Sequence, residues 1–138
     1  YYLSQNKLPE LGKVVMLAPP NPGSLIADTF RNEQWFKWLT GPAGQQLGTD
    51  KHGITGMLSA VDYPTGVIAG NDHNPVDNWM AEIIPGEDDG KVAVESAKLD
   101  GMADFIVLPS SHITIMKDDA VIEQSLYFLQ RGHFNHGP

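Results

Sequence analysis

Three short, continuous apolar runs constrain the fold of this chain more than any other feature. They occupy residues 14–18, 66–70 and 105–108, and the first and third are closed by proline residues. Continuous rather than alternating apolar character is typical of strands that are buried on both faces of a parallel sheet. Each run ends abruptly at Pro, Gly or Asn, residues that terminate strands. The sequence therefore predicts about three parallel strands.

Helical segments stand between and after these strands. Residues 120–131 are expected to form a helix that Asp118 or Asp119 caps and Gly132 ends, and a shorter helix is expected over residues 25–30. The longer helix has one apolar face at helical spacing, made of Val121, Ile122, Leu126 and Leu129. Strands that alternate with helices predict an α/β fold with flanking helices and right-handed crossovers.

Three parallel strands make a small sheet, which needs cover on both faces and leaves an edge unpaired. The opening residues 1–5 are typical of the last turns of a helix already under way. We therefore expect residues 1–138 to be the C-terminal portion of a single larger domain. Either a missing N-terminal half or a second copy in a homodimer would complete the sheet.

Charge and composition exclude several classes of partner. The chain carries 17 acidic against 9 basic residues, a formal net charge of -8, which disfavours binding to nucleic acid. No apolar run approaches the roughly 18 residues of a membrane span. The lack of cysteine excludes disulfides and thiolate metal sites. Together with the absence of a signal segment, it favours the cytoplasm over other compartments.

An acid and a histidine follow successive predicted strands. Asp89, with Asp88 beside it, comes after the second strand, and His112 comes after the third. In open α/β sheets, active sites gather at the carboxyl ends of the strands. The order Asp then His matches the last two members of a Ser–Asp–His triad. In such a triad the histidine takes a proton from a hydroxyl, and the carboxylate fixes its tautomer.

Three segments carry a resemblance to a known family. Residues 14–24 (VVMLAPPNPGS) resemble the sixth strand and following loop of bacterial lipase-like α/β-hydrolases. Residues 84–96 (IPGEDDGKVAVES) look like their Asp-Gly-x-Val acid loop, and residues 108–112 (LPSSH) are similar to their histidine loop. The resemblance implies a serine ester hydrolase that acts on an apolar ester without a cofactor. It places the triad acid at Asp89, with Asp88 as the fallback, and the histidine at His112.

The family's nucleophile has no counterpart in this chain. None of the serines stands in a Gly-x-Ser-x-Gly sequence, and Ser24, at a predicted helix start, lacks the signs of a nucleophile elbow. The enzyme interpretation therefore requires a serine segment upstream or in a partner chain. The alternative is a non-catalytic truncated fragment or a self-associating domain without hydrolase activity.

An aromatic segment is a candidate for the substrate pocket. Trp35, Phe36 and Trp38 could line a lid or an acyl pocket, since lipases cover their sites with mobile apolar segments. Ordinary core packing of an aromatic helix is the alternative.

Two clusters of polar residues are candidate metal sites. His133 and His136 have a His-x-x-His spacing, but no carboxylate or third ligand is evident, so a solvated tail is expected. The acidic residues near the second loop (Glu82, Glu87, Asp88 and Asp89) could hold calcium, although a solvated turn is the simpler interpretation. We predict no metal site.

Overall fold

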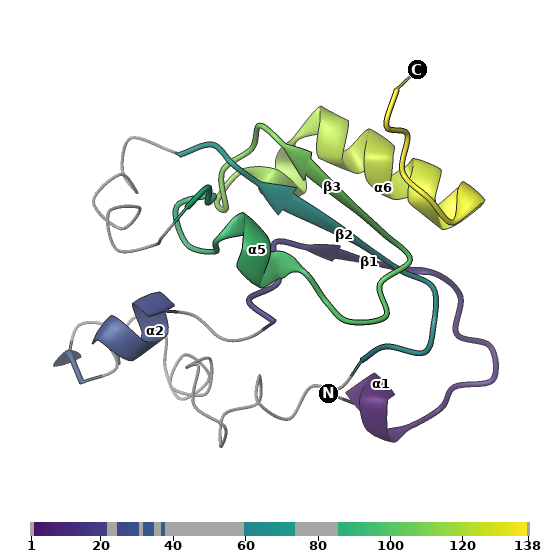
Figure 1. The fold of residues 1–138 in the computed structure, drawn as a ribbon, viewed down its shortest axis with the longest axis horizontal. Coiled ribbons are helices and arrows are strands. Elements are labelled where there is room, and N and C mark those ends of the chain that lie inside the picture. Colours follow the sequence, from purple (N-terminus) through teal and green to yellow (C-terminus); the bar gives the residue numbers. More distant parts are fainter. Residues whose placement is uncertain are drawn as a thin grey trace.

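The computed structural model describes residues 2–21, 25–30, 32–34, 37, 60–73 and 86–137. Its centre is a sheet of three parallel strands, β1 (Val14–Leu17), β2 (Thr65–Gly70) and β3 (Asp104–Leu108), in the order β1-β2-β3 (Figure 1). The three strands lie where the apolar runs predict them, and they are parallel. The predicted α/β class is confirmed.

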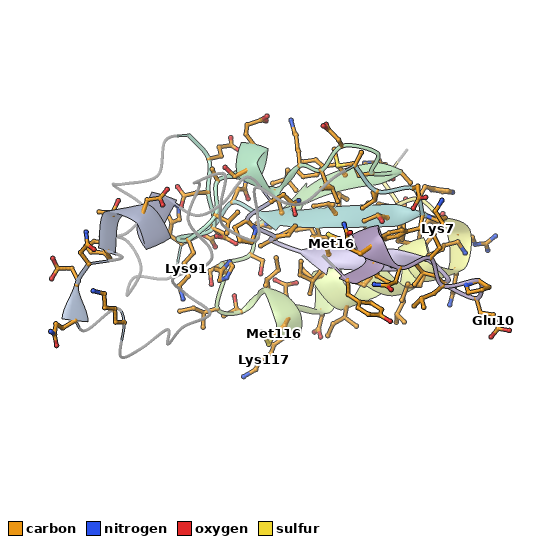
Figure 2. The ribbon with its side chains drawn as sticks, turned by 90° about the horizontal axis from the view of Figure 1, so that it is seen from below. Lys7, Glu10, Met16, Lys91, Met116 and Lys117 are labelled. Carbon is orange, nitrogen blue, oxygen red and sulfur yellow. The ribbon has the colours of Figure 1, made fainter. Side chains whose placement is uncertain are left out.

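Helices cover both faces of this sheet. Among the described residues, α5 (Val94–Ala97) covers one face and α6 (Asp119–Arg131) covers the other. The same residues also form α1 (Tyr2–Gln5), α2 (Leu25–Phe30) and the 3-10 helix η2 (Ile115–Lys117). Figure 2 shows the sheet edge-on, with α5 on one side and α6 on the other. Among the described residues, none of the helices has the length and apolar character needed to cross a membrane.

Successive side chains of β2 point to opposite faces of the sheet and pack into two separate hydrophobic cores. Ile68 points to the α6 side, where Val121, Phe128 and Phe134 are buried. Val67 and Ala69 point to the α5 side, where they join the apolar residues Val92, Val94 and Ala97. All of β2 is buried, as the sequence predicts for a strand covered on both faces. The residues of β1 and β3 are only partly buried, because each of these strands pairs on one side only within the described residues.

The ends of α6 follow the sequence rules. Asp118 is the N-cap, and its carboxylate accepts hydrogen bonds from the amides of Ala120 and Val121. Gly132 ends the helix at a φ of 85°, a left-handed conformation that glycine adopts without a steric penalty. Both predicted boundaries are confirmed.

The face that α6 buries differs from the predicted apolar face. Val121 and Phe128 are buried, and Ser125 between them is partly buried. These positions are spaced i, i+4 and i+7, so they form one line along the helix. The other members of the predicted face are 44–54% exposed, namely Ile122, Leu126 and Leu129. The helix is rotated because the aromatic ring of Phe128, rather than the leucines, enters the core.

The segment after α6 folds back onto the sheet. Phe134 is buried against Phe128, with ring centroids 4.9 Å apart. Gly66 of β2 lies beneath both rings, and a Cβ at this position would come within 2.6 Å of Phe128 and 2.7 Å of Phe134. A larger residue at position 66 would therefore displace the aromatic pair.

Candidate active site

Two loops meet beyond the carboxyl ends of β2 and β3. We call residues 86–93 the acid loop and residues 109–114 the histidine loop. In Figure 2, Lys91 of the acid loop marks this end of the sheet, whereas Lys7 and Glu10 lie at the opposite end. The candidate residues predicted from the sequence, Asp89 and His112, therefore lie where parallel α/β sheets place their active sites.

The acid loop holds Asp89 in one orientation. Oδ1 of Asp89 accepts hydrogen bonds from the amides of Lys91 (3.0 Å) and Val92 (2.8 Å), so the side chain closes the turn that follows it. Gly90, at a φ of 93°, supplies the left-handed residue of this turn. The Asp89 side chain is fully buried, which leaves Oδ2 to be satisfied by a group outside the loop.

That group is the imidazole of His112. Nδ1 of His112 lies 2.8 Å from Oδ2 of Asp89, and the His112 amide donates to the Asp89 carbonyl over 2.9 Å. Because an ionised carboxylate only accepts, the proton of the neutral imidazole is placed on Nδ1. The His112 side chain is 31% exposed, and no described residue bonds its Nε2. As far as the described residues extend, Nε2 is open to a reacting group, and the buried Asp89 carboxylate lies on the other side of the ring.

Gly70, the last residue of β2, allows the two loops to approach each other. A Cβ at this position would overlap the carbonyl oxygen of Ser110 and lie 3.0 Å from Cβ of Asp89. The next two residues of the chain bond to β3 and the histidine loop, through Asn71 to the Leu108 carbonyl and Asp72 to the Ser110 carbonyl. Any side chain at position 70 would therefore push Asp89 and His112 apart.

Asp88, the fallback acid, bonds to a different histidine. Its carboxylate is 3% exposed, and Oδ1 lies 3.0 Å from Nε2 of His73 and 2.7 Å from the Gly90 amide. His73 was not singled out from the sequence. The available signal was its place three residues after β2, at the same edge of the sheet as His112.

The remaining candidate residues from the sequence either lie outside the described residues or have other contacts. Trp35, Phe36, Trp38, Ser24 and Glu82 lie outside the described residues. Contrary to the sequence interpretation, His136 has a carboxylate partner, because its Nε2 lies 3.0 Å from both oxygens of Asp104. His133 contacts the Phe134 carbonyl instead. Among the described residues, no three His, Asp or Glu side chains form a group that could hold a metal ion.

Comparison with known proteins gives a likeness at the level of the fold. No protein-family model matches the sequence, and no curated protein is similar to it. Among solved structures, the chain is similar to the mature form of the Bacillus licheniformis lipase BlEst2, with a TM-score of 0.58 and 20% sequence identity. The alignment covers 86% of this chain and 55% of the lipase, so the chain spans about half of that protein. The likeness shows that the described sheet and helices have a distant lipase-like or esterase-like α/β fold.

Proposed function

We propose that this chain supplies the acid, Asp89, and the general base, His112, of a serine ester hydrolase. The observation that carries the proposal is the 2.8 Å contact between Oδ2 of Asp89 and Nδ1 of His112, which leaves Nε2 unbonded within the described residues. In this proposal Nε2 takes the proton from a serine hydroxyl and then gives it to the leaving alcohol. Asp89 holds the ring in place and stabilises the imidazolium that forms.

In this proposal the nucleophilic serine comes from outside these 138 residues, because none of the serines here stands in a Gly-x-Ser-x-Gly sequence. The chain is then one portion of a single hydrolase domain, and the rest is contributed by preceding sequence or by a partner chain. The substrate is an apolar ester, and Trp35, Phe36 and Trp38 are the candidates to line its pocket. The likeness to a lipase fold supports this class of substrate.

A fluorophosphonate probe tests this function, because it forms a covalent adduct with an activated serine. The species that contains this chain is isolated from its native source and treated with the probe, and its intact mass is then measured. The expected result is one adduct, either on a species larger than 15.1 kDa that contains this chain or on a partner chain isolated with it. His112→Ala should slow labelling by about a thousandfold or more, since the histidine activates the serine.

The matched control is His136→Ala, which removes the histidine of the Asp104 pair and should leave the labelling rate unchanged. A species of 15.1 kDa without an adduct, isolated without a labelled partner chain, would contradict the proposal and favour a non-catalytic, self-associating domain. An adduct on the 15.1 kDa chain itself would show that one of its own serines is the nucleophile.

A further inference from the structure

Asp88 and Asp89 are adjacent buried carboxylates, and each bonds to its own histidine. Asp89 bonds His112 from the histidine loop, whereas Asp88 bonds His73 from the segment that follows β2. The proposed function uses only the Asp89–His112 pair. The hydrogen bonds of the Asp88–His73 pair, described next, indicate a structural role for it.

The carboxylate of Asp88 closes the turn on which Asp89 lies. Oδ1 of Asp88 accepts from the Gly90 amide over 2.7 Å, and the backbone of Asp88 bridges to Ala93 at the far end of the loop. The direction of the Asp89 side chain depends on the same turn, since its Oδ1 binds the amides of the residues directly after Gly90. A change in the Asp88–Gly90 contact would therefore rotate the Asp89 carboxylate.

His73 connects this turn to the end of β2. Its Nε2 lies 3.0 Å from Oδ1 of Asp88, and because a carboxylate only accepts, Nε2–H is the donor. The backbone before His73 bonds to the histidine loop, through the Asp72 amide and the Ser110 carbonyl (3.4 Å). One short segment thus joins the loop that carries Asp89 to the loop that carries His112.

We infer that His73 and Asp88 are a positioning pair, which aims Oδ2 of Asp89 at Nδ1 of His112. The inference rests on the proposed function, because it assigns a role in orienting the proposed acid. The two residues act through the acid loop and do not contact the reacting atoms. Charge-assisted hydrogen bonds to a buried carboxylate are strong enough for this role, since loss of a partner leaves a desolvated charge.

Two substitutions of His73 separate the hydrogen bond from simple packing. His73→Gln keeps an N–H donor near the position of Nε2 and removes the ring. His73→Phe keeps the ring and removes the donor. The His73 side chain is 36% exposed, so neither change creates a cavity in the core. Thermal unfolding of both variants checks that they fold.

The readout is the proton on Nδ1 of His112, observed by NMR in the native species that contains this chain, labelled with ¹⁵N-histidine. A proton shared with a buried carboxylate resonates far downfield, and its loss in His112→Ala assigns the signal. We expect the signal in the wild type and in His73→Gln, and its loss in His73→Phe. A signal that persists in His73→Phe would overturn the inference, and so would its loss in both variants or its absence from the wild type.

This readout does not require a serine. A failed proposed function would appear as a lack of fluorophosphonate labelling in the native species, whatever the NMR signal does. A failed positioning role would appear as a His112 signal that does not depend on the donor at position 73. The two failures are therefore distinguishable.

Discussion

Two aspartate–histidine pairs lie at opposite ends of β3 and differ in how the carboxylate is used. Beyond the carboxyl end, Asp89 is fully buried and divides its oxygens, with Oδ1 bonded to loop amides and Oδ2 to Nδ1 of His112. At the amino end, Asp104 is 18% exposed and both of its oxygens face Nε2 of His136. The His136 ring is 53% exposed, against 31% for His112.

The difference shows why the residue types alone do not define a catalytic pair. Asp104 also accepts hydrogen bonds from the amides of Phe105 and Phe134, so it fastens the segment after α6 to the start of β3. Its histidine uses Nε2 for this attachment. His112 uses Nδ1, and its Nε2 has no partner among the described residues, at the end of the sheet where α/β enzymes place their sites. Under the proposed function the first pair does the chemistry, whereas the contacts of the second pair attach the C-terminal segment.

The largest expected effect is that of Asp89→Asn on catalysis. Asparagine cannot hold the reactive tautomer of His112 or stabilise its imidazolium, so ester hydrolysis should fall on the order of 10⁴-fold. The measurement is the rate of hydrolysis of a p-nitrophenyl ester by the native species that contains this chain. Asp104→Asn is the matched control and should leave this rate unchanged. An equal loss in both variants would remove the functional distinction between the two pairs.

A smaller effect, on stability, is expected at the amino end of β3. Phe134 is buried against Phe128 and the Gly66 backbone, so Phe134→Ala should lower the free energy of unfolding by about 3–5 kcal/mol. His136→Ala removes only an exposed partner of Asp104 and should cost less than about 1 kcal/mol. Urea unfolding of both variants gives the comparison. If His136→Ala lowered the free energy of unfolding more than Phe134→Ala, the contact with Asp104 rather than aromatic packing would hold the segment after α6 in place.

The smallest effect should be a pH dependence of the Asp104 attachment. Burial alone raises the pKa of Asp104, but the Phe134 amide, the His136 imidazole and the Phe105 amide outweigh it and lower the pKa below its ordinary value. A lowered carboxyl pKa stabilises the fold fully above the ordinary value of about 3.9, and this stabilisation is lost as the pH falls through the lower folded value.

Urea midpoints of the wild type and Asp104→Asn, measured from about pH 7 to about pH 2, test this dependence. The difference between the two proteins should be constant near neutrality and should shrink in acid. A difference that stays constant down to the lowest pH would mean that the charge of Asp104 contributes nothing to the attachment.

Local features of the sequence were sufficient to predict the three strands and the helices α2 and α6, but they did not predict α5 or η2. The apolar runs of β1, β2 and β3 lie within a residue of the observed strands, and Asp118 and Gly132 bound α6 as the capping rules require. The same rules place Asp89 and His112 after adjacent strands, at one edge of the sheet. These features depend on neighbours a few residues apart, so they can be read without knowledge of the packing.

Partner choice was decided only by the tertiary structure. The sequence leaves Asp88 and Asp89 as alternative acids, and the turn at Gly90 directs them to different histidines, His73 and His112. Likewise, Asp104 and His136 are 32 residues apart, and nothing local to either residue predicts that they meet. Adjacent side chains leave a turn in directions that depend on its backbone angles, and the close approach of the two loops at Gly70 brings one of these side chains to His112. The sequence by itself determined which strands and loops would form, and the packing determined which carboxylate each histidine contacts.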